Sequence, residues 1–429
     1  MSRTAFVNAH LIDPDSGLSG KGALLVENSK IADLGPRLFN DARPTGAEVI
    51  DCNGQILAPG LIDLRVFTGE PGAEHRETLA SASESAAAGG VTSFALMPVT
   101  DPVIDEPALV DFIKRRAAAT AKVNVYPTAA LTHGLNGERM AELGLLKEAG
   151  AVAFTDADRT IASSLIMRRC LTYAANYDAL VIAHAEDPAL AAVGHMNEGA
   201  FAARMGVGGI PPAAEAIIVE RDLRLVELTG ARYHLGQVST AASLDIIAKA
   251  KARGLPVTCA VSAHHLVLNE QDIGEYKTFA KVSPALRTED DRKAMIEGVR
   301  SGVIDAIVSS HDPQAPETKR LPFAQAAYGA VGLETLLPAA LSLHHDNELE
   351  LIDILRRLTI NPAKLLRLPA GRLAKGAPAD LIVFDPTAPR KIDPTTFRSR
   401  SKNSPFKGRL MQGQVSRTLV GGTTVFAGQ

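Results

Sequence analysis

Residues 164–184 read SLIMRRCLTYAANYDALVIAH, and this stretch contains the repeating unit that decides the fold. Ser164 to Tyr177 predicts a helix, and Ala179 to His184 is a short apolar run that predicts a buried strand. The same order of helix and then strand returns across the middle of the chain, at intervals of about 20–50 residues. Repetition of this unit indicates a parallel α/β fold.

Four further units have the same form. Their predicted strands lie at 91–96, 151–154, 255–258 and 306–309, and each follows a predicted helix, at 79–89, 138–148, 241–251 and 289–299. For residues 57–370 we therefore expect an eight-unit (β/α)8 TIM barrel. A doubly wound sheet is the alternative, but no glycine-rich dinucleotide fingerprint favours it.

The two ends of the chain have a different character from the middle. Near the N-terminus, short apolar or alternating runs at 5–7, 23–26 and 48–51 are separated by turn residues. Near the C-terminus, residues 379–386 predict a strand followed by a turn, and residues 418–426 predict a hairpin. We expect residues 1–56 and 371–429 to form one small β-sandwich domain together.

Composition excludes several classes of protein. The net charge of −3 gives no reason to expect a nucleic-acid partner, and no apolar run is long enough to span a bilayer. The first residues, Met-Ser-Arg-Thr-Ala-Phe, lack the apolar core of a signal peptide. The three cysteines, Cys52, Cys170 and Cys259, are widely spaced and suit buried free thiols. We expect a cytoplasmic protein without a membrane association.

An ordered series of motifs resembles the dihydroorotases of the amidohydrolase superfamily. It runs from about Asn8 to Val425 and includes 58–63 (APGLID), 70–72 (EPG), 89–92 (GGVT), 97–98 (MP), 184–187 (HAED), 211–215 (PPAAE), 221–223 (RDL), 238–240 (VST), 264–266 (HHL), 286–287 (LR), 332–335 (GLET) and 361–363 (NPA). Single members of the series are weak signals, whereas their order and spacing make the resemblance strong. It implies a TIM barrel of the metal-dependent-hydrolase type with a β-sandwich built from both ends.

The resemblance also implies a metal site, and this chain departs from it. The family binds zinc through a His-x-His pair on the first barrel strand, where this chain has Arg65 and Phe67. Arginine cannot be deprotonated and phenylalanine has no donor atom, so neither can be a zinc ligand. A later histidine ligand is replaced by Gln237, while Asp156 and His184 remain as remnants.

The catalytic base and the substrate contacts implied by the resemblance are also replaced. Ser310 stands where the family has the aspartate base, and the neighbouring His311 and Asp312 do not restore it, since Asp312 is displaced by two residues. A serine hydroxyl cannot replace a carboxylate that carries the amide proton. The positions of the family's substrate-binding residues are Gly69, Val99, Ser283 and His264, and only the last keeps the expected residue type.

Three hypotheses follow. The first is a non-catalytic dihydroorotase-like subunit of de novo pyrimidine biosynthesis, with no cofactor, that forms homodimers and acts as a structural partner of aspartate transcarbamoylase; this partner comes from the resemblance. The second is an active dihydroorotase, or another cyclic-amide amidohydrolase, with a rebuilt zinc site. The third is a binding module that holds a small anion through Arg65. For the first, we expect Arg65 to pair with Asp156 in place of the metal and Phe67 to fill the cavity. The alternative is that Arg65 extends to solvent and Asp156 caps a loop.

Overall fold

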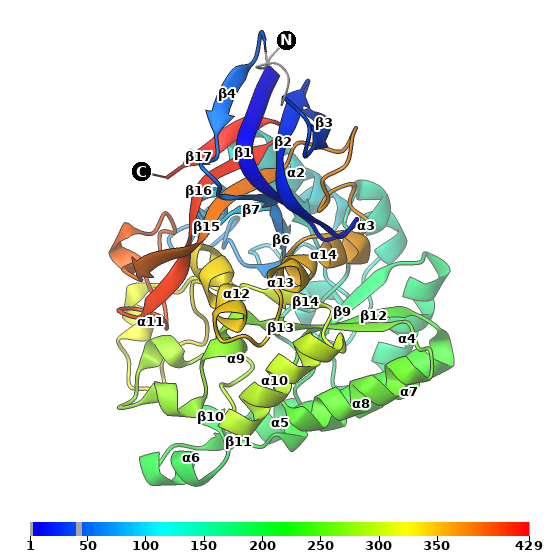
Figure 1. Cartoon of the computed structure of the whole chain (residues 1–429). Coiled ribbons are helices and arrows are strands. Elements are labelled where there is room, and N and C mark those ends of the chain that lie inside the picture. Colours follow the sequence, from blue (N-terminus) through cyan, green and yellow to red (C-terminus); the bar gives the residue numbers. More distant parts are fainter. Residues whose placement is uncertain (1–2, 40–44, 429) are drawn as a thin grey trace.

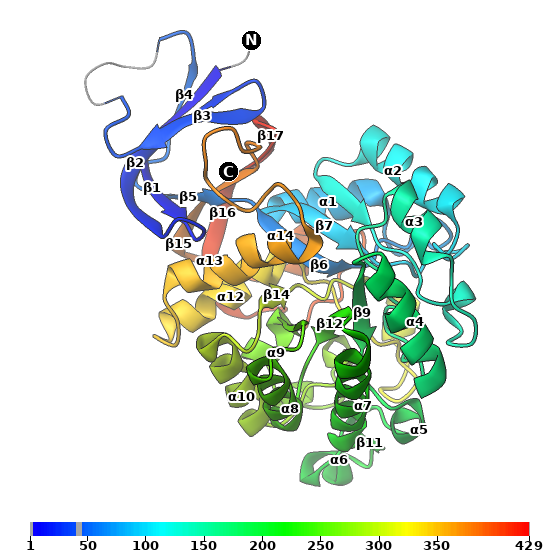
Figure 2. The same cartoon turned by 90° about the vertical axis from the view of Figure 1, so that its right-hand side faces the viewer.

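The computed structural model describes residues 3–39 and 45–428, arranged as a barrel and a sheet domain (Figure 1). The expectations for the first two residues and for 40–44 lie outside the described residues. Figure 2 shows the sheet domain at one end of the barrel, with both chain ends in it. The expected fold class, a metal-dependent-hydrolase-type barrel with a domain from both termini, is confirmed.

Strands from both ends of the chain form the sheet domain. Its strands are hydrogen-bonded in the order β17-β16-β15-β5-β1-β2-β3, with β4 beside β1. Their bounds are β1 Arg3–Asp13, β2 Leu18–Glu27, β3 Lys30–Gly35, β4 Glu48–Asp51, β5 Ile56–Pro59, β15 Leu381–Lys391, β16 Leu410–Val420 and β17 Thr423–Ala427. Phe6, Leu24 and Leu57 share one core with Leu381 and Leu419. This shared core joins the two ends of the chain.

The barrel strands run parallel and close on themselves. Their bounds are β6 Leu61–Val66, β7 Val91–Leu96, β8 Asn124–Pro127, β9 Leu180–His184, β12 Arg232–Gln237, β13 Val257–Ser262 and β14 Ala306–Val308. Between β8 and β9, Phe154 bridges to Ala129 on one side and to Val181 on the other. A bridge from Val66 to His311 closes the circle. The C-terminal ends of the strands therefore meet on one face, which we call the barrel mouth.

Helices surround the barrel strands. The main ones are α1 Leu79–Ala88, α2 Pro107–Thr120, α3 Leu143–Ala149, α4 Ser164–Asn176, α7 Ala213–Thr229, α8 Ala241–Ala252, α10 Glu289–Ser301, α12 Leu336–His345, α13 Leu351–Leu358 and α14 Ile360–Leu366. Helix α4 shows why these segments are helical. The Ser163 hydroxyl accepts a hydrogen bond from the Ile166 amide, and Met167, Cys170, Leu171 and Ala174 form one buried stripe.

Shorter elements lie in the loops that follow the barrel strands. They are α5 Pro188–Ala191, β10 Met196–Asn197, α6 Ala200–Met205, β11 Gly209–Ile210, α9 Ala263–Val267 and α11 Pro316–Lys319. The sequence had predicted neither β8 nor β12 as strands. In β12, Arg232, His234 and Gln237 interrupt the apolar run that would mark a buried strand. Among the described residues, no helix is long and apolar enough to cross a membrane.

Candidate functional site

The implied site residues come from different strands and meet at the barrel mouth. Arg65, His184 and Gln237 lie at the C-terminal ends of β6, β9 and β12, while Asp156 and Ser310 begin the loops after Phe154 and β14. All five are at most 8% exposed. Barrel closure therefore brings together residues that are far apart in the sequence.

Arg65 and Phe67 occupy the mouth as one packed unit. They stand two residues apart on the same face of the chain, and the Arg65 guanidinium carbon lies 5.2 Å from the Phe67 ring centroid. Phe67 packs in the apolar interior of the barrel with Met97 and Ala157. The prediction that Phe67 fills the cavity agrees with this packing.

The expected pair between Arg65 and Asp156 was wrong. The Asp156 carboxylate accepts hydrogen bonds from the backbone amides of Leu131 and Thr132, at 2.9 and 3.0 Å, and from the Thr132 hydroxyl. Arg65 instead donates to the backbone carbonyl of Ala157 at 3.3 Å and is buried, so it does not extend to solvent. Burial raises the pKa of Asp156, although its hydrogen bonds oppose the shift.

His184 and Gln237 lie side by side on neighbouring strands. They are paired in the register of β9 and β12. The Nε2 atom of His184 lies 3.9 Å from a Glu186 carboxylate oxygen, so this carboxylate is its nearest acidic neighbour. Neither the amide nitrogen nor the amide oxygen of Gln237 has a hydrogen-bond partner within the described part of the chain.

At the end of β14, each of three neighbouring residues has a different role. Ser310 has a φ of 51°, in the left-handed region. The Nδ1 atom of His311 accepts a hydrogen bond from the Gly332 amide, and its Nε2 atom lies 3.5 Å from the Glu77 carboxylate. Asp312 accepts from Arg76 at 2.7 Å and from Gln314 at 2.8 Å. Asp312 is therefore hydrogen-bonded within the protein, and Ser310 supplies no carboxylate at the position where the resemblance implies the base.

The substrate positions implied by the resemblance do not form a contact set. Gly69 has a φ of 73°, and a Cβ atom there would lie 2.6 Å from the carbonyl oxygen of Ala73, so an arginine would not fit without backbone movement. Val99 packs against the apolar barrel interior, and Ser283 precedes a cis proline. The His264 ring lies 5.5 Å from that of Phe406, and burial lowers its pKa to about 3. A histidine in this apolar environment is neutral at pH 7.

The residues at the barrel mouth do not fit the zinc site that the resemblance implies. Zinc needs at least three protein donors, and Arg65 and Phe67 supply none. Both oxygens of Asp156 already accept hydrogen bonds. Over residues 3–39 and 45–428, no three or more His, Cys, Asp or Glu side chains are grouped so that they could hold a metal ion.

Several motifs that carried the resemblance form a structural network. The buried Glu215 carboxylate accepts from the backbone amides of Ser239 and Thr240, at 3.0 and 3.1 Å. Arg287 donates to the Ser239 hydroxyl at 3.0 Å and to the carbonyl of Ile210 at the same distance. These residues hold the loops after β12 and β13.

The sequence did not point to Arg76 or Glu77, which hold Asp312 and His311. No spacing rule links them, because Arg76 and Asp312 are separated by 236 positions in the chain. Only the closure of β6 on β14 brings them together. Their position in the loop between the first barrel strand and helix α1 was the one available signal.

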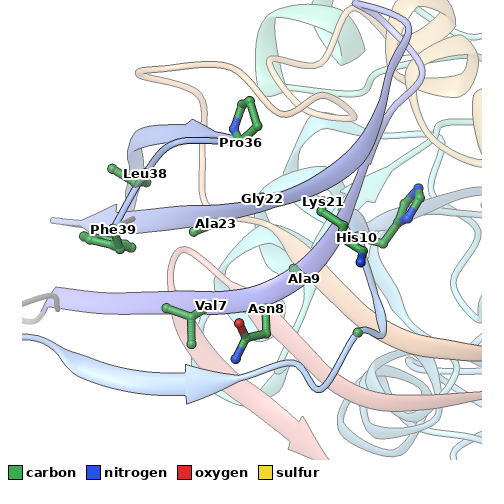
Figure 3. Close-up of a pocket in the computed structure, with 11 residues that line it drawn as sticks. Val7, Asn8, Ala9, His10, Lys21, Gly22, Ala23, Pro36, Leu38 and Phe39 are labelled. Carbon is green, nitrogen blue, oxygen red and sulfur yellow. The ribbon is translucent and has the colours of Figure 1, made fainter. Parts of the chain in front are cut away.

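A separate cavity of about 390 Å³ lies in the sheet domain. Figure 3 shows Asn8 and His10 on β1, Lys21 on β2, and Leu38 and Phe39 in the segment after β3. The His10 ring is hydrogen-bonded to Ser19 at 3.1 Å. Among its described lining residues there is no paired acid and base.

The family described as Dihydro-orotase-like matches residues 54–243, and the family described as Amidohydrolase family matches residues 309–426. A dihydroorotase of Ehrlichia canis is 47% identical over 424 residues, which cover 98% of this chain and 94% of the relative. A dihydroorotase of Syntrophus aciditrophicus is 42% identical and covers 97% of each chain. Among solved structures, the L-hydantoinase of Arthrobacter aurescens is 26% identical, with a TM-score of 0.89 over 99% of this chain and 96% of its own.

Proposed function

We propose that this chain, which belongs to the dihydroorotase family of the amidohydrolases, does not catalyse the family reaction and serves pyrimidine biosynthesis as a structural partner of aspartate transcarbamoylase. One observation carries the first part of this proposal. Arg65 and Phe67 pack on each other where the resemblance implies the first two metal ligands. A positive guanidinium and an apolar ring in that place oppose the binding of a dication.

Other features of the mouth support the same reading. Gln237 replaces a third imidazole, Ser310 replaces the base, and the backbone around Gly69 has no room for a carboxylate-binding arginine. These losses affect separate contributions to catalysis, namely the activated water, proton transfer and substrate orientation. The buried network around Glu215 is intact, which supports a protein retained for its fold and surface.

The partner follows from the resemblance, because dihydroorotases of this type often associate with aspartate transcarbamoylase. A shared fold does not by itself establish a partner, so the association requires a direct test. We further propose that the chain enters the complex as a homodimer. A surface that the transcarbamoylase requires would preserve the fold after the reaction was lost.

The test is capture of the tagged full-length chain from native lysate, followed by gel filtration with the transcarbamoylase of the same organism. We expect the two proteins to co-elute in a fixed ratio. An Arg65→Met variant is the matched control, and it should bind equally well because the proposal gives the mouth no part in assembly. The proposal fails if the transcarbamoylase assembles and works normally without this chain and the two do not co-elute.

The second candidate is an active dihydroorotase, or another cyclic-amide amidohydrolase, with a rebuilt metal site. Its specific support is the 47% identity to a protein named dihydroorotase, together with the retained Asp156 and His184. Metal analysis of the captured sample separates the two candidates. One or two tightly held zinc ions per chain, together with turnover that a chelator abolishes, would establish the second.

A further inference from the structure

The Arg65 guanidinium is a buried positive charge without a paired carboxylate. The residue is 5% exposed, and among the described residues the one hydrogen bond of its guanidinium is the 3.3 Å contact to the Ala157 carbonyl. No ion pair joins it to any carboxylate in residues 3–39 and 45–428, and its Nε atom has no partner there. Burial lowers the pKa of Arg65, which reflects the unfavourable desolvation of the charge. An unpaired buried charge is costly unless another group or a ligand compensates it.

Another buried guanidinium of the same barrel shows the contrast. Arg287 is 2% exposed and donates to the side chains of Ser239 and Asn197 and to the Ile210 carbonyl, although its Nη2 atom has no partner among the described residues. The protein thus supplies three acceptors to Arg287 but only one distant acceptor to Arg65. The Arg65 guanidinium therefore has unused hydrogen-bond donors at the barrel mouth.

Gln237 is the second, independent observation. It is 2% exposed, and both polar atoms of its amide lack partners in the part of the chain that the structure describes. Buried amides are hydrogen-bonded as a rule, so two unused polar atoms indicate a missing partner. The side chain lies at the C-terminal end of β12, on the same barrel face as Arg65 at the end of β6.

The carboxylates around the barrel mouth indicate which class of ligand could be the missing partner of Arg65 and Gln237. Asp156 and Asp312 are occupied by hydrogen bonds within the protein. We propose that the barrel mouth binds a small planar monoanion, a carboxylate or bicarbonate, with Arg65 providing the charge and the Gln237 amide a further hydrogen bond. Asp63, Asp158 and Asp312 lie close enough to Arg65 to offset part of its charge. This favours a monoanion over a phosphate dianion and an affinity in about the millimolar range.

The site goes beyond the structural role proposed above and does not depend on it. In a metal site the protein donors bind a cation, whereas here a cationic side chain of the protein binds an anion. Loss of the transcarbamoylase complex would leave the anion site untouched. Tightly bound zinc would overturn the non-catalytic proposal and would be detected separately by metal analysis.

The test measures thermal unfolding and calorimetric titration of the full-length chain at constant ionic strength. Sodium formate, sodium acetate and sodium bicarbonate are compared with sodium phosphate and sodium chloride. We expect saturable stabilisation by formate, acetate or bicarbonate, and a weaker effect of phosphate. Bicarbonate acting alone identifies an inorganic ligand, whereas stabilisation by formate and acetate identifies the carboxylate of an organic acid; either result supports the site.

Variants assign the effect to the proposed residues. Arg65→Met should bind at least about tenfold more weakly, since a charge-assisted hydrogen bond is lost, and Gln237→Leu should bind more weakly than wild type. Arg159→Met is the matched control, because Arg159 is an exposed arginine in the same mouth loop. In chloride alone, Arg65→Met should unfold at the same temperature as wild type or higher. Stabilisation that does not saturate, or that is equal in wild type and Arg65→Met, overturns the proposal.

Discussion

The guanidinium of Arg65 lies over the ring of Phe67, with 5.2 Å between the guanidinium carbon and the ring centroid. These two positions are where the resemblance to dihydroorotases implies a His-x-His pair. The cation is attracted to the aromatic face, and the two side chains occupy the space in which metal ligands would be needed. The two substitutions therefore form one packed unit at the barrel mouth.

Metal content is the first expected outcome. The purified chain should carry far less than one zinc ion per molecule, because Arg65, Phe67 and Gln237 supply no imidazole. Elemental analysis checks this. A triple variant with histidine at all three positions is the matched comparison and should retain more zinc than wild type. One or two tightly held metals in the wild-type protein would contradict the prediction.

The second expected outcome concerns catalysis. The chain alone should neither cyclise carbamoyl aspartate nor hydrolyse dihydroorotate in a spectrophotometric assay. Ser310→Asp should not restore turnover, because there is no activated water for a base to assist. Gly69→Arg should not restore it either, because the side chain would collide with the Ala73 carbonyl. Turnover that is lost with a chelator and regained with zinc would refute this expectation.

The third prediction concerns side-chain packing at the barrel mouth. Phe67→Ala should destabilise the fold by about 3–5 kcal/mol, since Phe67 is 6% exposed and its removal leaves a cavity. Phe112→Ala on α2 is the control, because Phe112 is 39% exposed. Its cost should be about 1 kcal/mol or less. Urea unfolding of both variants measures the difference, and equal costs would show that Phe67 does not fill the cavity.

The fourth prediction concerns backbone strain at the barrel mouth. Ser310 and Ala157 have φ angles of 51° and 58°, a region that glycine tolerates better than residues with a Cβ atom. Ser310→Gly and Ala157→Gly should each raise the free energy of unfolding by up to about 1 kcal/mol. Ala153→Gly, at a buried position without a positive φ, should destabilise. Chemical denaturation distinguishes these signs, and a loss of stability in both of the first two variants would exclude strain at the mouth.

The pH dependence of stability gives the fifth. Burial raises the pKa of Asp63 from 3.8 to about 6, although hydrogen bonds from Ser309 and from the Arg65 amide oppose the shift. The folded state therefore holds the Asp63 proton more tightly than the unfolded state. The stability that this proton provides is present below about pH 4 and is lost as the pH rises to about 6.

Asp63→Asn removes this titration. Between pH 4 and pH 7 the wild type should lose stability relative to the variant. The difference in unfolding free energy should change by at most about 3 kcal/mol over this range. Urea unfolding across that range, at constant ionic strength, provides the measurement. Curves that stay parallel would mean that Asp63 does not titrate as its burial indicates.

The sequence by itself determined the fold class and the fact that neither Arg65 nor Phe67 can be a metal ligand. Alternation of helix and strand predicts a parallel α/β fold because each apolar strand must be covered by the helix that follows or precedes it. Loss of donors at Arg65 and Phe67 could be predicted because donor chemistry belongs to the residue type and needs no geometry. The missed strand β12 shows the limit, since its polar residues hide a buried strand.

Only the tertiary structure decided which groups pair at the barrel mouth. Asp156 was expected either to pair with Arg65 or to cap a loop, and the loop after β8 places the amides of Leu131 and Thr132 against its carboxylate. Asp312 binds Arg76 because β14 closes on β6. Such pairings depend on distances of a few ångströms between segments far apart in the chain, and a hydrogen bond forms only when donor and acceptor lie within about 3 Å. Residue type sets which chemistry is possible, and barrel closure selects the partner.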